Sequence, residues 1–183
     1  INSQSFSKVI VMDPHSDVLE ACLNNFKKIS NFRLVDYALS NMNGRNSQIA
    51  IVSPDAGALK KIFDVAKEFN ITNVTTASKV RDIATGNILK TELPTMDLTD
   101  IEHFVIIDDI CSKGGTFIAL AKELKKYSPK SIILLVSHYE GTADISKLNE
   151  AGISAIYATD SLPYKVLGIG NPFIKTNILS YVS

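Results

Sequence analysis

An apolar run, an acidic pair and a loop with two glycines follow one another just past the middle of the chain. Residues 104–107 lead into Asp108 and Asp109, and residues 112–116 then open a helical pattern. The two carboxylates can accept hydrogen bonds from vicinal ribose hydroxyls. The loop turns its amides toward an anion, glycines allow close approach, and a helix N-terminus favours negative charge. The segment therefore predicts a sugar-phosphate site.

The alternative for this segment is a simple strand-to-helix turn in which Asp109 or Ser112 only caps the helix. A cap needs one such residue, whereas this loop offers a series of polar and glycine positions in a phosphate-binding order. We therefore favour the sugar-phosphate site, whose candidate residues are Asp108, Asp109, Ser112, Lys113, Gly114, Gly115 and Thr116.

Carboxylates also follow two other apolar runs. Asp55 ends one run within a Ser-Pro-Asp-Ala-Gly segment, and Asp13 ends another, closely followed by His15. Taken alone, Asp55 could be a helix N-cap and His15 could be structural. A carboxylate beside a histidine also suits a divalent cation or a phosphate. Because ligands bind outside the carboxyl ends of parallel strands, we expect Asp13, Asp55 and Asp108 at one rim of the sheet.

A Lys-Val-Arg triplet places two cations, Lys79 and Arg81, on the same side of an extended segment. Such a pair can clamp a polyphosphate as charge develops in phosphoryl transfer. The alternative is a solvated surface, which most such triplets form. The triplet lies within residues 77–99, where Gly86 and Pro94 indicate a flexible segment or a hairpin near the site.

Polar residues follow two more apolar runs. His138 comes after residues 132–136, and a Thr-Asp-Ser segment comes after residues 153–157. These residues either complete the rim or are ordinary polar residues at strand ends. The ordinary interpretation is slightly favoured for His138.

Apolar runs of strand length alternate with helical patterns along the chain. This alternation, with strands that are apolar on both faces, predicts an α/β fold in which helices cover a twisted parallel sheet. A polar stretch at residues 38–47 is expected to be a surface excursion. The expected strands are residues 9–12, 49–52, 104–107, 132–136 and 153–157, and the expected helices are residues 17–28, 56–69, 115–127 and 143–150.

Length and composition limit the class of protein. The 183 residues are expected to form one domain. The 19 basic and 19 acidic residues balance, which gives no electrostatic case for binding nucleic acid or a membrane surface. No signal peptide or transmembrane stretch is visible. Cys22 and Cys111 lack metal-ligand spacing, and so low a cysteine count favours the reducing cytoplasm.

The order of these motifs resembles ribose-phosphate diphosphokinase, also called phosphoribosyl pyrophosphate (PRPP) synthetase. The duplicated halves of that family share the type I phosphoribosyltransferase fold, which is Rossmann-like. The resemblance spans residues 8–163. The matching segments are residues 9–15 (family Asp-Leu-His), 52–57 (Val-Ser-Pro-Asp-Ala-Gly), 79–81 (Lys-x-Arg), 108–116 (Asp-Asp-Met-x-Asp-Thr-x-Gly-Thr), 137–141 (Thr-His-Gly) and 158–163 (Thr-Asp/Asn-Thr-Ile-Pro).

The resemblance implies transfer of the β,γ-diphosphate of ATP to the 1-hydroxyl of ribose 5-phosphate, giving PRPP and AMP. Lys79 and Arg81 would stabilise the transferring diphosphate. Magnesium would bridge the phosphates, with His15 and Asp55 as its protein ligands and Asp13 in support of His15. The family also implies a homo-oligomer, and the match to its second half implies a chain that is the C-terminal half of a longer protein.

On the sugar side, the resemblance implies that Asp108 and Asp109 bind ribose hydroxyls and that residues 112–116 hold the 5-phosphate. The chain departs from the family here, because Ser112 and Lys113 stand where the family has Asp-Thr. This exchange removes one carboxylate and adds a cation. Near the histidine motif, the usual leucine is a proline and the aromatic pair that follows is absent.

Two other functions stay open. One is a type I phosphoribosyltransferase that consumes PRPP, although that family would not be expected to carry Ser-Pro-Asp-Ala-Gly and Lys-x-Arg in this order. The other is a non-catalytic paralogue that regulates or assembles with an active synthetase. The altered loop is consistent with such a paralogue, whereas the retained Lys79 and Arg81 argue against it.

Overall fold

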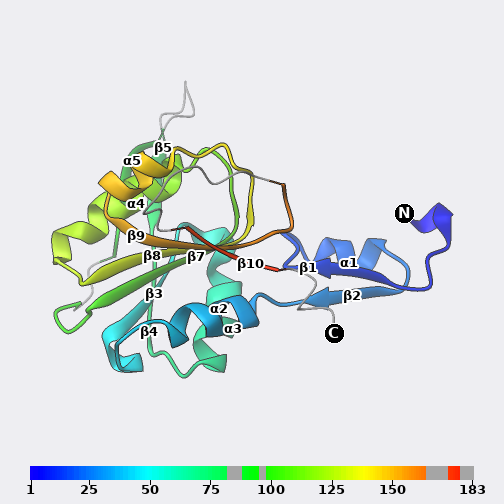
Figure 1. Ribbon diagram of the computed structural model, residues 1–183, viewed down its shortest axis with the longest axis horizontal. Coiled ribbons are helices and arrows are strands. Elements are labelled where there is room, and N and C mark those ends of the chain that lie inside the picture. The colour runs from blue at the N-terminus through cyan, green and yellow to red at the C-terminus, as the bar shows by residue number, and fades with distance from the viewer. Residues whose placement is uncertain (82–87, 95–97, 164–172, 178–183) are drawn as a thin grey trace.

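The computed structural model describes residues 1–81, 88–94, 98–163 and 173–177 of the chain. Within these ranges the main body is a six-stranded parallel sheet with the strand order β10-β9-β8-β7-β3-β4. Helices cover both faces of the sheet (Figure 1), which confirms the predicted fold class. The strands are β3 (Ile49–Ser53), β4 (Asn73–Thr76), β7 (His103–Cys111), β8 (Ser131–Tyr139), β9 (Ile153–Thr159) and β10 (Phe173–Thr176).

The helices of the main body lie in two layers, one against each face of the sheet (Figure 1). Three of them form crossovers between parallel neighbours, which need such a connection because a tight turn cannot join them. None of the helices in the described ranges has the length and apolar character that a membrane crossing requires. One layer contains α2 (Phe32–Ser40) and α3 (Leu59–Glu68), and the other contains α4 (Gly115–Leu124) and α5 (Ile145–Glu150).

Alternate residues of the central strand β7 enter two separate hydrophobic cores. Phe104 and Ile106 pack in the core beneath α4 and α5. Val105 and Ile107 pack in the opposite core, beneath α2 and α3. All four side chains are fully buried. Because both faces of the sheet are covered, the strand is a continuous apolar run, which is why it could be recognised in the sequence.

Short 3-10 turns extend two of the helices to the predicted lengths. η3 (Ala56–Ala58) precedes α3, and η4 (Lys125–Tyr127) follows α4. In a separate two-stranded sheet, β5 (Ser78–Arg81) and β6 (Ile88–Glu92) pair antiparallel, which confirms the hairpin alternative for residues 77–99. The remaining turns are η1 (Asn2–Gln4) and η2 (Asn46–Gln48).

The first predicted strand lies outside the main sheet. β1 (Val9–Met12) pairs in parallel with β2 (Phe26–Ile29) in a separate two-stranded sheet. Together with α1 (Val18–Cys22), this small sheet projects from the main body in Figure 1.

The helix predicted over residues 17–28 is therefore wrong in its second half. Asn25 has a φ of 55°, a left-handed conformation that asparagine tolerates, and it turns the chain into β2.

The prediction of a surface excursion is wrong for residues 38–40. These residues belong to α2, which places Leu34, Val35 and Ala38 against the sheet with no exposed surface. The helix is short, and it follows β2 after only two residues. In the sequence, the apolar residues of α2 were therefore hard to tell apart from those of the strand just before it.

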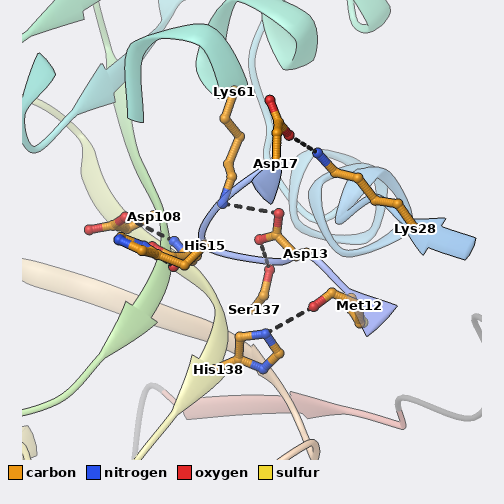
Figure 2. A network of polar contacts seen from close by, with 10 residues as sticks. Met12, Asp13, His15, Asp17, Lys28, Lys61, Asp108, Ser137 and His138 are labelled. Atoms are coloured by element: carbon orange, nitrogen blue, oxygen red, sulfur yellow. Dashed lines mark hydrogen bonds and ion pairs between the residues drawn. The ribbon is translucent and has the colours of Figure 1, made fainter. Parts of the chain in front are cut away.

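Asp13, the residue after β1, holds the small sheet against the main body. Its carboxylate accepts a hydrogen bond from the Ser137 hydroxyl and pairs with Lys61, whose Nζ lies 3.0 Å from Oδ1 (Figure 2). Asp13 is buried and has a φ of 43°, a conformation that is uncommon for residues other than glycine. Its backbone N–H donates to the carbonyl oxygen of Ile29 at 2.8 Å. The Asp13 carboxylate thus joins β1, α3 and β8.

His138 adds a second link between β1 and the main sheet. Its Nε2 lies 3.1 Å from the carbonyl oxygen of Met12, and its Nδ1 lies 2.7 Å from the Ser161 hydroxyl. Figure 2 shows this ring on the opposite side of the β1 end from Lys61. These contacts agree with the ordinary, structural interpretation of His138.

We expect Lys61→Met to lower the free energy of unfolding by about 3 kcal/mol, because it leaves the Asp13 carboxylate buried without its cation. The side chains of Lys61 and Asp13 are only 22% and 3% exposed. Urea unfolding near neutral pH measures the loss. Lys60→Met is the matched control, because Lys60 pairs with Asp17 at the surface, where the two side chains are 79% and 58% exposed. Equal losses in the two variants would contradict the anchoring role of Asp13.

Candidate active site

A pocket of about 350 Å³ opens where the small sheet meets the carboxyl ends of β3 and β7. Asp13, Asp55 and Asp108 all line it, so these three carboxylates share one rim, as their positions in the sequence predict. His15 and Asp109 line the same pocket. The arrangement brings together residues from three distant segments of the chain, although the role of each remains a prediction.

The acidic pair lies within β7 rather than after it. The predicted strand end at residue 107 is wrong because the pairing with β8 continues as far as Cys111. The Asp109 backbone N–H donates to Asp108 Oδ1 at 2.9 Å. His15 donates its Nδ1–H to Asp109 Oδ2 at 2.7 Å; Figure 2 shows the loop that carries His15 next to Asp13. The loop after β1 therefore reaches the acidic pair directly.

The two carboxyls of the pair have opposite pKa shifts. Burial raises the pKa of Asp108 to about 7, and the neighbouring Asp109 carboxylate adds to the rise. Burial also acts to raise the pKa of Asp109. The hydrogen bond with Asp108, the charge of Lys61 and the contact with His15 outweigh that effect and leave the pKa of Asp109 below its ordinary value. At neutral pH Asp109 is ionised while Asp108 titrates, so the pair can both donate and accept hydrogen bonds.

Asp55 has the cap geometry that the sequence left open. Its Oδ1 accepts a hydrogen bond from the Gly57 backbone N–H at 3.0 Å, and its carbonyl oxygen accepts one from the Ser53 hydroxyl at 2.5 Å. The negative charge of Asp55 also contributes to the raised pKa of Asp108, after burial and Asp109. Asp55 is thus both an N-cap and a contributor to the electrostatics of the rim.

The glycine loop leads from β7 into α4 as predicted. Gly114 has a φ of 76°, and a β-carbon there would lie 3.1 Å from the β-carbon of Ala143, so this position requires glycine on both grounds. Gly115 has open space where a β-carbon would be, which leaves the N-terminus of α4 accessible. Of the other candidate residues, Ser112 and Lys113 are exposed and Thr116 is half-buried.

The loop and the acidic pocket are adjacent parts of the same sheet edge. Among the residues that the structure describes, none from 112–116 lines the 350 Å³ pocket. The loop begins directly after Cys111, the last residue of β7, and the acidic pair lies within the same strand. A ligand that contacts both must therefore extend from the carboxylates toward the N-terminus of α4.

The predicted cation pair lies on β5, and the side chains of Lys79 and Arg81 lie outside the part of the chain that the structure describes. The backbone places the start of this hairpin beside the site. The Ala77 N–H donates to the carbonyl oxygen of Ser53 at 2.9 Å, close to Asp55. The proximity predicted for the hairpin therefore agrees with the backbone.

The predicted metal residues do not form a complete set of protein ligands. In the described ranges, no three His, Cys, Asp or Glu side chains gather closely enough to hold a metal ion. Asp13 is engaged by Lys61, and His15 by Asp109. Magnesium is commonly bound by one or two carboxylates together with substrate phosphates. The metal site therefore stays a prediction.

Several pocket residues were missed in the sequence, among them Lys61 and Asn31. Lys61 follows Lys60, and such a pair on a helix is usually solvated surface, yet both lysines line the pocket and Lys61 reaches the buried Asp13 carboxylate. Asn31 also lines the pocket and is buried, and its Nδ2 has no hydrogen-bond partner among the described residues. Asn31 directly precedes α2, a helix that sequence reasoning did not detect, so nothing indicated where its amide would point.

We expect Asp108→Asn to stabilise the protein at about pH 8 by roughly 1–3 kcal/mol. The pKa of this carboxyl rises from 3.8 to about 7 on folding, so the stability of the unmodified protein falls as the pH rises through that window. The variant removes the charge but keeps an acceptor for the Asp109 N–H. The gain should disappear at about pH 4, where Asp108 stays protonated in the folded protein. Urea unfolding at both pH values measures the difference, and an equal gain at both would contradict the assignment.

Curated relatives of this chain carry the name ribose-phosphate pyrophosphokinase. The protein from Sulfolobus acidocaldarius is 30% identical over 125 residues, which cover 67% of this chain and 42% of the relative. The protein from Marinomonas sp. is 24% identical over 181 residues, which cover 96% of this chain and 55% of the relative. The chain thus spans about half the length of these relatives.

The fold has a counterpart among solved structures. Phosphoribosylpyrophosphate synthetase from Mycobacterium smegmatis superposes with a TM-score of 0.81 at 16% sequence identity, covering 99% of this chain and 58% of that protein. At this identity the likeness concerns the fold. A family model described as phosphoribosyl transferase domain matches residues 25–156. The chain therefore belongs to the phosphoribosyl transferase domain family, and its fold is that of a PRPP synthetase.

Proposed function

We propose that this chain carries the ribose 5-phosphate side of a ribose-phosphate diphosphokinase. The observation that carries the proposal is the 2.7 Å contact between His15 and Asp109. It joins the Asp-Pro-His motif after β1 to the acidic pair of β7, so two motifs that resemble the same family meet at one site. The name shared by the curated relatives supports the same reaction.

The sugar phosphate would extend along the sheet edge. The ribose hydroxyls would meet Asp108 and Asp109, where an ionised carboxylate accepts hydrogen bonds and a partly protonated one can donate as well. The 5-phosphate would meet the N-terminus of α4, where the open space at Gly115 permits close approach of an anion. The separation of the carboxylates from the loop supports a ligand with hydroxyls at one end and a phosphate at the other.

The proposed reaction transfers a diphosphate from ATP to the sugar. The oxygen of the ribose 1-hydroxyl would form a bond to the β-phosphorus and lose its proton to solvent, while the bond between that phosphorus and the α-phosphate oxygen breaks and releases AMP. Lys79 and Arg81 of β5 would neutralise the charge that develops on the transferring group. The hairpin that carries them starts beside Ser53, at the same rim as the pocket.

The pocket fits a magnesium ion that enters with the phosphates. The His15 side chain is 87% exposed and is oriented through Nδ1 by Asp109, an arrangement common for metal-binding histidines. Asp55 offers a carboxylate at the same rim. Magnesium would supply charge neutralisation at the β- and γ-phosphates. Asp13, held by Lys61 and Ser137, would position the loop that carries His15.

The two alternatives make different demands on the site. A type I phosphoribosyltransferase that consumes PRPP would use the same acidic pair and glycine loop, but the contact between His15 and Asp109 favours the diphosphokinase because it adds the histidine motif to them. A regulatory paralogue is favoured by one observation, the serine at position 112 where the related pattern has aspartate.

An AMP-release assay on the full-length gene product separates these functions. We expect AMP to form from ATP only when ribose 5-phosphate and magnesium are both present. A phosphoribosyltransferase would instead release diphosphate from PRPP in the presence of a base. A regulatory paralogue would do neither alone. AMP formation that does not depend on the sugar would contradict the proposed function.

We expect Lys79→Ala to reduce AMP release at saturating substrate about a hundredfold or more, the loss typical of removing one group that stabilises a transition state. Ribose 5-phosphate affinity, measured by calorimetry, should change little. Lys67→Ala in α3 is the control, because this lysine is exposed near the end of the helix, away from the carboxyl edge of the sheet. Unchanged turnover in the Lys79 variant would reject its assignment.

A further inference from the structure

Glu140, the residue after β8, places a carboxylate against the glycine loop. The Ser112 hydroxyl donates a hydrogen bond to Glu140 Oε2. The backbones of the two segments are joined as well, because the Glu140 N–H donates to the carbonyl oxygen of Cys111 at 3.0 Å. The end of β8 and the start of the loop are thus connected through both side chain and main chain.

The segment that carries Glu140 is fixed beneath the loop. The Tyr139 hydroxyl donates to the carbonyl oxygen of Ala143 at 3.0 Å, and both residues are buried. Ala143 also packs closely against Gly114, where an added β-carbon would lie 3.1 Å from its own. Because this turn is held on both sides, the backbone of Glu140 is fixed next to the loop, and the hydrogen bond from Ser112 orients its carboxylate.

The charge of Glu140 reaches the interior of the site. Burial raises the pKa of the Cys111 thiol to about 12, and the charges of Asp108 and Glu140 add to the rise. The same negative charge must oppose a phosphate that approaches the loop, since both are anions. Lys113 is the loop's own cation, and it is exposed next to Ser112.

A hydroxyl has a single proton to donate. In this structure Ser112 gives it to Glu140, so the same proton cannot also serve a bound phosphate. We propose that Glu140 determines the phosphate affinity of the loop by competing with the ligand for the Ser112 hydroxyl. The inference rests on the proposed function, because it takes a sugar phosphate as the ligand of residues 112–116. It adds a residue just after β8 that opposes binding and so limits affinity.

A double-mutant cycle on ribose 5-phosphate affinity tests this competition. Calorimetry would compare the full-length protein with its E140A, S112A and doubly substituted forms. We expect E140A to bind ribose 5-phosphate about threefold tighter or more, the size expected for one charge at an exposed site. In the S112A background the gain should be smaller, because no hydroxyl remains to be released.

Glu68→Ala is the matched control. Glu68 is an exposed carboxylate at the last residue of α3, at the opposite edge of the sheet, so its removal changes the net charge equally without touching the loop. Its affinity should equal that of the unmodified protein. Circular dichroism would establish that all variants fold. If E140A does not fold, Glu140→Gln would replace it, because glutamine keeps the shape of the side chain.

The outcomes separate the inference from the proposed function. No gain in E140A, or the same gain with and without Ser112, would overturn the role of Glu140 while ribose 5-phosphate still binds. If none of the forms binds ribose 5-phosphate, the unmodified protein included, the result contradicts the proposed function. The role of Glu140 then fails with it.

Discussion

The Lys61 ammonium balances negative charge that two separate parts of the fold bring to one place. It pairs with Asp13 at 3.0 Å and, against the effect of burial, helps to lower the pKa of Asp109. Carboxylates buried without such a cation would each cost the folded state several kcal/mol, on the order given for buried charges. A single lysine in the first turn of α3 therefore helps to hold the small sheet in place and, after the hydrogen bond with Asp108, helps to keep Asp109 ionised. The position of His15 depends on both effects, because its loop begins at Asp13 and its ring donates to Asp109.

The carboxyl edge of the sheet combines two opposite electrostatic environments. The 350 Å³ pocket is rich in carboxylates, which favour hydroxyl groups and cations. The N-terminus of α4, which follows in the chain, favours anions. The carboxylates of the pocket would repel a free phosphate. A free sugar would make no use of the N-terminus of α4. A sugar phosphate satisfies both at once, which supports this ligand class independently of any likeness to other proteins.

The sequence could predict the parts of this fold that depend on local pattern. Strands such as β8 are continuous apolar runs because they are buried on both faces, and the acidic pair stands out because it interrupts such a run. The pairing of β1 could not be predicted, since its residues are as apolar as those of β3 although it joins a different sheet. Lys61 was missed for a related reason. Only the packing of α3 decides which of two adjacent lysines reaches the buried Asp13 carboxylate.

The exchange at Ser112 changes how negative charge reaches the loop. The related pattern has an aspartate at this position, whose charge would be part of the loop itself. Here the carboxylate comes from Glu140, the residue after the neighbouring strand β8, and a hydrogen bond connects it to the loop. The Ser112 hydroxyl can exchange this hydrogen bond for one to a ligand, whereas an aspartate at position 112 would keep its charge within the loop. Under the proposed function, the opposition to a bound phosphate would therefore be reversible. The same contact connects the end of β8 to the loop between β7 and α4.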